Sequence, residues 1–382
     1  MRLVLLTFAL FGTAMAAAPA AAFQTDAPKP TNASPIKTET VAKGLASPWG
    51  LQFLPDGRMV VTEKPGRLRV VTREGKIGPA IDGVPAVAAA GQGGLLDVLL
   101  ARDFSTSGTI YFSYAEPREN GAAGTAVARA RLSLDPSGGG KLEDVRVIFS
   151  QDQSIMSKNH FGSRLVWAPD GSLFVTTGDR GSARDEVQKP SSFIGKVMSL
   201  KPDGEAASSE PARLGWDPKI WSMGHRNIQG AAIDPATGTL WTIEHGAKGG
   251  DELNRTERGK NFGWPIITYG REYFGGAIGE GSSKPGLEQP VYYWVPSIAT
   301  SGLAIYTADL FPGWKGNIFV GGLAGAQLAR LVLKDGEVVE EETLLEDLDH
   351  RVRDVRQGPD GALWLLTDDA RDGQILRIVP ND

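Results

Sequence analysis

The chain has 382 residues, with 40 Lys and Arg against 45 Asp and Glu and a formal net charge of −5 at pH 7. It contains no Cys, which excludes disulfides, thiolate metal sites and a thiol nucleophile. The mildly acidic balance gives no sign of a basic face, so we expect no nucleic-acid partner. The 48 Gly exceed ordinary usage and predict a chain that turns often.

The N-terminus is typical of a secretory signal peptide. Arg2 precedes an apolar run over residues 3–11, and small residues suited to cleavage follow. A single membrane anchor is the alternative, but it needs about 20 apolar residues, so we expect no stable membrane insertion. We therefore predict a cleaved signal peptide over residues 1–22, a flexible leader over 23–36, and a periplasmic or secreted domain over 37–382.

The remainder of the chain carries a sixfold repeat. In each unit a turn that ends in glycine precedes a short run of alternating apolar residues, a combination typical of a turn and a strand. The six turn residues are Gly57, Gly108, Gly171, Gly238, Gly316 and Gly361. Each interval holds about four short strands, which is the size of a propeller blade. The fold class predicted is therefore all-β, a six-bladed β-propeller; a β-sandwich is the alternative, which six regular units disfavour.

Two further expectations follow from the repeat. Residues 38–45 have strand composition but lie outside the six units, so we expect them to pair with the C-terminal strands and close the ring. The interval after Gly238 is the longest and has the densest polar and glycine content, so the main functional insertion is expected there.

Polar residues gather just before or after the repeat strands. In a propeller, loops from several blades converge on the axis at one face, so these clusters are candidate site residues. They comprise Gln92, Asn159-His160, Asp179-Arg180, His225-Arg226-Asn227, Glu244-His245, Asp251-Glu252, and Arg351 with Arg353.

Most of these clusters have a structural and a functional interpretation. His160 is either a structural hydrogen-bonding residue or a base that titrates near neutral pH. Arg226 and Asn227 form either a solvated turn or an anion-recognition pair. Arg351 and Arg353 alternate along an extended segment and point the same way, which is unfavourable unless an anion lies between them.

A glycine-rich loop over residues 246–254 suits a cation. Three glycines precede Asp251 and Glu252, and calcium prefers six to eight oxygen ligands, many of them carbonyls in glycine turns. The spacing is not that of an EF-hand. Aromatic residues follow over 261–274, where packing under a long loop and a lid over a cofactor are both open.

Five motifs occur in one order and together resemble the soluble aldose sugar dehydrogenases, relatives of soluble glucose dehydrogenase that use pyrroloquinoline quinone (PQQ). These motifs span 91–97, 160–165, 224–230, 244–254 and 261–265. The resemblance covers the chain from about residue 38 to the C-terminus. It implies a six-bladed propeller that binds PQQ and Ca²⁺, oxidises the C1 hydroxyl of an aldose sugar to a lactone, and passes electrons to an unknown acceptor. A monomer and a dimer are both compatible with it.

The resemblance also implies roles for individual residues. His160 is the implied general base, and Arg226 is the implied second catalytic residue. The implied cofactor contacts are Gln92, Arg226, Asn227, Tyr273, Ala324, Arg351 and Arg353. The main-chain carbonyls of Gly246 and Ala247 match the ligands of a calcium beside the cofactor, and Glu252 with the carbonyl of Phe262 matches a second calcium site.

One departure from the family concerns the loop over residues 321–326. The family carries a lysine there that reaches the cofactor, whereas this loop has no charged residue. Ala324 is therefore left with a backbone contact at most, and Lys248 from another blade is one possible substitute. Two other functions stay open, a calcium-dependent lactonase-type hydrolase and a non-catalytic sugar-binding propeller, although three arginines favour an anionic cofactor.

Overall fold

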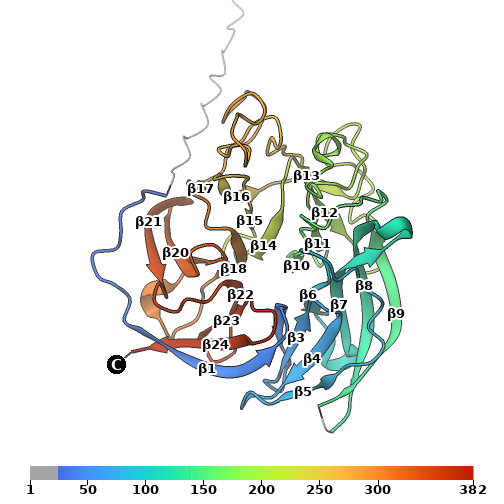
Figure 1. The fold of residues 1–382 in the computed structure, drawn as a ribbon, viewed down its shortest axis with the longest axis vertical. Coiled ribbons are helices and arrows are strands. Elements are labelled where there is room, and N and C mark those ends of the chain that lie inside the picture. The colour runs from blue at the N-terminus through green and yellow to red at the C-terminus, as the bar shows by residue number, and fades with distance from the viewer. Residues whose placement is uncertain (1–24, 137, 382) are drawn as a thin grey trace, which may run out of the picture.

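The computed structural model describes residues 25–136 and 138–381; the predicted signal peptide lies outside them. Within this part of the chain the regular structure consists of 24 strands, one short helix and three 3-10 turns. The strands form six antiparallel sheets of four strands each, arranged as blades around a central axis (Figure 1). The predicted six-bladed β-propeller is confirmed. The helical segments are α1 (Phe104–Ser107), η1 (Glu119–Gly121), η2 (Arg184–Glu186) and η3 (Pro312–Trp314).

The six blades follow one another along the chain. Blade one contains β2 (Pro48–Phe53), β3 (Met59–Glu63), β4 (Arg67–Val71) and β5 (Ile77–Ala80), and blade two contains β6 (Leu95–Leu100), β7 (Thr109–Pro117), β8 (Ala123–Leu134) and β9 (Gly140–Ser150). Blade three contains β10 (Leu165–Trp167), β11 (Leu173–Thr176), β12 (Lys196–Leu200) and β13 (Ile220–Met223), and blade four contains β14 (Ile228–Ile233), β15 (Leu240–Glu244), β16 (Asp251–Thr256) and β17 (Tyr292–Trp294). Blade five contains β18 (Thr300–Ile305), β19 (Ile318–Gly322), β20 (Gln327–Lys334) and β21 (Glu337–Leu344), and blade six contains β22 (Val352–Gln357), β23 (Leu363–Thr367), β24 (Gly373–Pro380) and β1 (Ile36–Leu45).

The ring is closed by a strand from the N-terminal end of the domain. β1 pairs antiparallel with β24, with Thr38 opposite Ile378, and becomes the outermost strand of blade six. The expected pairing of residues 38–45 with the C-terminal strands is therefore confirmed. A closed ring leaves no inner sheet edge open, and it joins two segments of sequence that are more than three hundred residues apart.

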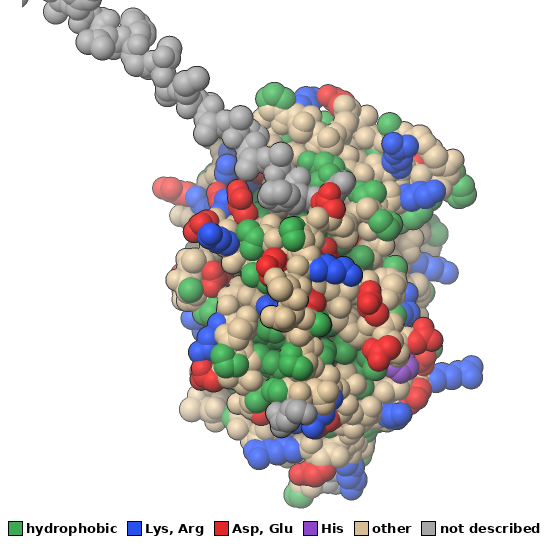
Figure 2. Space-filling model, turned by 90° about the vertical axis from the view of Figure 1, so that its left-hand side faces the viewer, with side chains coloured by type: hydrophobic (Ala, Val, Ile, Leu, Met, Phe, Trp, Pro, Cys, Tyr) green, Lys and Arg blue, Asp and Glu red, His purple; other side chains and the backbone are tan. Residues whose placement is uncertain are grey.

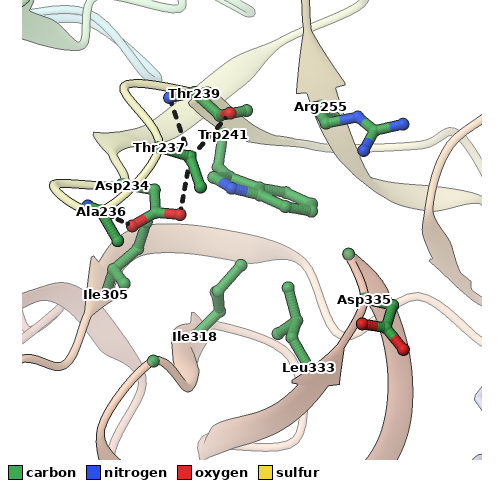
Figure 3. Close-up of a pocket in the computed structure, with 12 residues that line it drawn as sticks. Asp234, Ala236, Thr237, Thr239, Trp241, Arg255, Ile305, Ile318, Leu333 and Asp335 are labelled. Carbon is green, nitrogen blue, oxygen red and sulfur yellow. Dashed lines mark hydrogen bonds between the residues drawn. The ribbon is translucent and has the colours of Figure 1, made fainter.

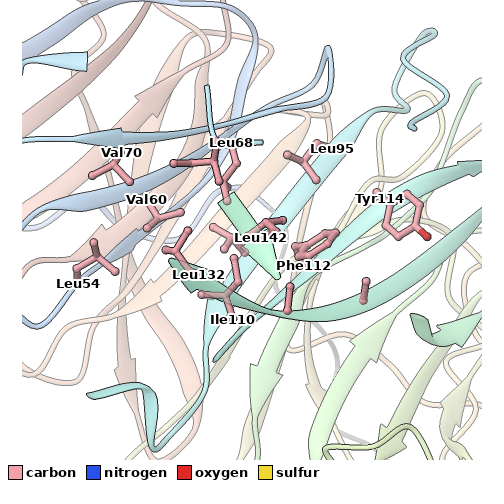
Figure 4. Close-up of a cluster of buried hydrophobic side chains, with 14 of the residues drawn as sticks. Leu54, Val60, Leu68, Val70, Leu95, Ile110, Phe112, Tyr114, Leu132 and Leu142 are labelled. Atoms are coloured by element: carbon pink, nitrogen blue, oxygen red, sulfur yellow. The ribbon is translucent and has the colours of Figure 1, made fainter. Parts of the chain in front are cut away.

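Hydrophobic side chains fill every interface between neighbouring blades. Six clusters join blades one and two, two and three, three and four, four and five, five and six, and six and one. Figure 4 shows the first, where Val60, Leu68 and Val70 of blade one meet Ile110 and Phe112 of blade two. Burying each such side chain contributes about 1.5–3 kcal/mol, so the alternating apolar pattern of the repeat strands is what holds adjacent blades together.

The strand order fixes which loops share a face of the ring. In each blade the second strand runs antiparallel to the innermost one, so the repeat glycine turns between them all lie at one end of the ring. Gly57 and Gly361 have φ of 83° and 81°, a backbone conformation that favours glycine. The turns after each second strand, and the connections between blades, lie at the opposite end, which carries the candidate site.

A buried charge network crosses the centre of the ring. Arg164, just before β10, donates to Asp97 on β6 at 2.9 Å and lies 3.1 Å from Asp354 on β22. Arg356 on β22 pairs with the same two carboxylates, at 3.1 Å and 2.9 Å. Arg164 also lies 4.5 Å from the ring centre of Trp49. Each charge has two opposite partners, which is the condition under which buried ions are tolerated.

Residues 25–35, part of the predicted leader, run against blade five. The hydroxyl of Ser34 donates to Glu342 at 2.7 Å, and the amide of Glu341 donates to the carbonyl of Pro28 at 3.1 Å. Figure 2 shows this side of the molecule, where acidic and basic side chains are interspersed. Throughout the described residues, no helix has the length and apolar character needed to cross a membrane.

Candidate active site

The loops at one end of the ring bring the predicted polar residues together. The amide of His160 donates to Oε1 of Gln92 at 2.7 Å, which joins the two connections on either side of blade two. Oδ1 of Asn227 accepts from the amide of Gly162 at 3.1 Å. Arg353 in blade six donates to Gln229 in blade four at 2.7 Å, and this contact spans the ring. Residues that lie far apart in the sequence therefore surround one central space.

His160 is held by a buried carboxylate. Its Nδ1 lies 2.6 Å from Oδ1 of Asp179, which also accepts from the amide of Gly181 at 2.6 Å. The other oxygen of Asp179 accepts from Nε1 of Trp264 at 2.8 Å. Three donors thus fix a carboxylate that has no exposed surface. Because Nδ1 is engaged, Nε2 is the ring nitrogen that remains to accept a proton from a ligand.

The environment keeps His160 neutral. Burial is the largest influence and lowers the pKa of His160 below its usual range, and the charge of Arg226 acts in the same direction. The hydrogen bond that His160 donates to Asp179 opposes this shift. A neutral imidazole, oriented by a carboxylate, is the form that a general base requires.

His225, by contrast, has both ring nitrogens engaged inside the protein. Nδ1 lies 2.9 Å from Glu244, Nε2 lies 2.8 Å from the hydroxyl of Ser222, and the ring stacks on Phe262. This residue is buried and structural. Of the two histidines, only His160 combines an anchored ring with a nitrogen left for chemistry.

Arg226 lies beside His160 and is itself buried. Its Nη1 donates to the carbonyl of His245 at 3.1 Å and to that of Gly246. The guanidinium lies 5.3 Å from the ring centre of Trp264, which therefore touches both Arg226 and Asp179. Four buried donor or acceptor atoms around this space have no hydrogen-bond partner within the described residues: Arg226 Nε, Asn227 Nδ2, His245 Nε2 and Arg353 Nε. Unpaired buried polar atoms are costly, and their concentration here indicates a polar ligand.

Arg351 and Arg353 share an anion, and that anion is a carboxylate of the chain itself. Oδ2 of Asp368 accepts from both guanidinium groups at 3.0 Å. Although burial acts in the opposite direction, the two arginines lower the pKa of Asp368 to about 2. Asp368 therefore stays ionised at neutral pH and holds the two arginines side by side.

The glycine loop presents oxygen atoms to the same space. Gly249 and Gly250 have φ of 82° and 76°, and the loop folds back so that a side chain at Gly246 would meet the carbonyl oxygens of both. Asp251 anchors the loop, accepting from the amide of Gly246 at 2.8 Å and from Ser297 at 2.7 Å. The carbonyl of Gly246 is close enough to accept from Arg226, which links this loop to the axial residues.

A second group of oxygens lies at Glu252. Asn254 donates to Glu244 at 3.1 Å and to Glu252 at 3.3 Å, and its own Oδ1 is buried without a partner in the described chain. Burial and the neighbouring Glu244 raise the pKa of Glu252 well above its usual range. The ring of Phe262 stacks on His225, which binds Glu244. Across the described residues, no set of three His, Cys, Asp and Glu side chains is arranged to hold a metal.

Two predicted cofactor residues lie at the margin. Tyr273 stands on an exposed turn with 60% of its surface accessible, and the neighbouring Glu272 ties that turn to Arg184. Ala324 is exposed and follows Leu323, whose carbonyl accepts from Arg351 at 3.2 Å. The structure therefore brings the loop of Ala324 to the arginine pair but leaves Tyr273 with no hydrogen bond to any other predicted site residue in the described chain.

Several residues of the site had no individual role in the sequence prediction: Asp179 and His245 stood only among the candidate clusters, Trp264 only in the last motif, and Asp368 was not named. Asp179, His245 and Asp368 follow the second strand of blades three, four and six, and Trp264 lies in the long insertion of blade four. Their common position just after a repeat strand is a signal that a register-by-register comparison of the six units can detect. Lys64 holds the same position in blade one.

The cavity shown in Figure 3 is a different feature. It has a volume of about 430 Å³ and lies between blades four and five, lined by Asp234, Thr237, Trp241 and Asp335. Those residues belong to the turn end of the ring that carries Gly238 and Gly316, opposite the candidate site. None of the predicted site residues lines it.

Comparison with known proteins identifies the family. The family model described as glucose / sorbosone dehydrogenase matches residues 45–377. The chain belongs to this family. This chain is also 41% identical to "Aldose sugar dehydrogenase YliI" of Escherichia coli. The alignment covers 91% of this chain and 94% of that relative. The resemblance drawn from the five motifs is confirmed.

Solved structures of the family have the same fold. The apo form of the soluble aldose sugar dehydrogenase from Escherichia coli is 40% identical with a TM-score of 0.86, and the match covers 90% of this chain and 99% of the other. The PQQ-bound form of the aldose sugar dehydrogenase from Streptomyces coelicolor is 28% identical with a TM-score of 0.75, covering 91% of this chain and all of the other. This chain is thus a sugar-dehydrogenase-family oxidoreductase.

Proposed function

We propose that this chain oxidises the C1 hydroxyl of aldose sugars to lactones, with PQQ and calcium as cofactors, and passes the electrons to an external acceptor. The observation that carries the proposal is the pairing of His160 with the buried Asp179 beside a set of unpaired polar atoms. We also propose that the enzyme is exported to the periplasm or secreted.

The donor set fits an anionic quinone. Arg226 Nε, Asn227 Nδ2 and Arg353 Nε are buried donors without a partner in the described chain, and they suit carbonyl and carboxylate oxygens. We assign Arg226 and Asn227 to the quinone oxygens, Gln92 to a further contact with the cofactor, Tyr273 to an aromatic over it, and Arg351 and Arg353 to its carboxylates. Ala324 is left with a backbone contact.

The donor set for calcium is made of oxygen. The carbonyls of Gly246 and Ala247 would hold a calcium beside the quinone, in a loop that glycine lets fold back on itself. Glu252 and the carbonyl of Phe262 would hold a second calcium, near the buried Oδ1 of Asn254. A divalent cation at Glu252 would offset the repulsion between its carboxylate and that of Glu244.

The chain's own residues supply the proton transfer. Nε2 of His160 takes the proton of the C1 hydroxyl, and Asp179 stabilises the imidazolium that forms because it binds Nδ1 at 2.6 Å. Arg226 provides positive charge where negative charge develops on the acceptor oxygen. When bound, the quinone would supply the acceptor for the C1 hydride and its two electrons, and calcium would polarise that acceptor. Trp264 keeps Asp179 in place through Nε1.

The arrangement gives less support to a hydrolase. A calcium-dependent lactonase would need convergent carboxylates and amides on the axis that are available to a cation. Here the axial carboxylates Asp97 and Asp354 are each paired with two arginines, Arg164 and Arg356. The paired arginines suit an anionic cofactor, and His160 suits a sugar hydroxyl that gives up a proton.

The test is reconstitution of the purified protein with calcium and PQQ, followed by aldose-dependent reduction of an artificial dye. We expect turnover that requires both additions. His160→Ala should bind PQQ as the wild type does but lose at least about a hundredfold in turnover, because a general base contributes roughly 10²–10⁴-fold. Absence of dye reduction with several aldoses, or full activity in His160→Ala, would refute the proposal.

A further inference from the structure

Lys64 connects the Gln92 loop with the loop that follows β23 and carries Asp368 and Asp369. Its amide donates to the carbonyl of Ser47 at 3.0 Å, and the amide of Ser47 donates to the carbonyl of Asp369 at 2.7 Å. Its Nζ donates to the carbonyl of Gly91 at 2.8 Å. The side chain is half-buried and follows β3 at the end of the ring that carries the candidate site.

The charges around Lys64 do not balance. Arg351 and Arg353 are close enough to lower the pKa of Lys64, in addition to the larger effect of burial, and Asp368 acts in the opposite direction. Two of these three cations bind Asp368 directly, and Lys64 lies within electrostatic reach of all three groups. The nearby Asp369 adds little, because its carboxylate accepts the amides of Arg371 and Asp372 within its own exposed turn. Within the described residues the ammonium of Lys64 binds a carbonyl and no carboxylate, and a half-buried cation beside like charges is unfavourable unless an anion joins it.

The blade-five loop explains why a further cation is needed. Residues 321–326 carry no charge where the family has a lysine, and the carbonyl of Leu323 binds Arg351. Lys248, the substitute considered from the sequence, is exposed and has its backbone paired with Arg271. Lys64, by contrast, follows β3 in blade one, which is the neighbour of blade six and its arginine pair.

We propose that Lys64 is the third cation of the anion-binding cluster and contacts a carboxylate of the quinone in place of the missing blade-five lysine. This assignment rests on the proposed function. Asp368 is the positioning residue of the same cluster, since it binds both arginines and keeps them parallel. The cluster then has two positive charges more than its own carboxylate neutralises, which suits a ligand with more than one carboxylate.

The test measures binding rather than turnover. PQQ is titrated into calcium-loaded protein, and its dissociation constant is read from quenching of tryptophan fluorescence for the wild type, Lys64→Met and Lys64→Arg. Lys76→Met is the matched control, because Lys76 is exposed in the turn before β5, at the other end of the same blade. Thermal unfolding of each protein shows whether the fold has changed.

We expect Lys64→Met to raise the dissociation constant by at least about tenfold and to reduce its dependence on NaCl, because a charge-assisted contact is lost. Lys64→Arg should restore binding to within about threefold, and Lys76→Met should bind as the wild type does. Wild-type binding with an unchanged constant in Lys64→Met overturns the assignment alone. Equal weakening in Lys64→Met and Lys64→Arg, with a lower melting temperature, also overturns it and points to a structural role. If the wild type itself does not bind PQQ, the proposed function fails and the assignment fails with it.

Discussion

Replacing Asp179 with asparagine tests how the carboxylate supports His160. In the wild type three N–H groups, from His160, Gly181 and Trp264, donate to two carboxylate oxygens at 2.6–2.8 Å. An amide has one oxygen, so at least one donor must face an NH₂ group. If that donor is His160, its Nδ1 becomes an acceptor, the proton moves to Nε2, and the base is lost.

The size of the effect follows from these contacts. A hydrogen bond to a charged group is worth about 1.5–3 kcal/mol, and each 1.36 kcal/mol in the barrier corresponds to about tenfold in rate. Loss of the Asp179 charge alone therefore predicts a fall in kcat of roughly 10- to 100-fold, and a change of tautomer adds to it. PQQ affinity should change little, because Asp179 is bound to protein donors and not assigned to the cofactor.

The pH profile gives a second readout with a definite sign. The rate should rise with pH as His160 loses its proton, along a limb that lies below the usual range of histidine because burial lowers the pKa of His160. Asp179 stabilises protonated His160, so removing its charge moves that limb to still lower pH.

The assay is steady-state dye reduction by reconstituted enzyme from about pH 4 to 8, with Asp185→Asn as control, since Asp185 is exposed in the same loop. A kcat within about threefold of the wild type in Asp179→Asn, or a limb moved to higher pH, would refute the reasoning.

Three other predictions concern binding and stability. Arg353→Ala should weaken PQQ binding by at least about tenfold, since Arg353 carries a buried donor without a partner in the described chain; an unchanged dissociation constant in fluorescence titration would argue against its role. Glu252→Gln should weaken calcium binding roughly tenfold through loss of ligand charge, measured by calorimetry, and equal calcium affinity would contradict the assignment. Asp97→Ala should reduce the free energy of unfolding by about 3–5 kcal/mol, because it leaves two buried guanidinium groups short of a partner. A loss below about 1 kcal/mol in urea unfolding would show that the network relaxes.

The sequence alone determined the architecture. Glycine turns followed by alternating apolar residues are local signals, and six of them specify six blades because each blade repeats the same local pattern. The candidate residues could be found from the same local signals, since His160, Arg226 and Arg353 lie at strand ends, where propeller loops converge. The family resemblance followed from the order of short motifs, each readable without knowing the fold.

Only the tertiary structure decided which side chains are partners. Asp179 of blade three and Trp264 of the blade-four insertion are 85 residues apart, and they meet because neighbouring blades bring their loops to the same end of the ring. The alternation of Arg351 and Arg353 required an anion, but the sequence could not show that Asp368 provides it. The proposed role of Lys64 depends on the same closure: Lys64 comes from the first blade, and the first and sixth blades become neighbours only when β1 joins β24. Charge pairing across a closed ring depends on distances in space, which no local pattern encodes.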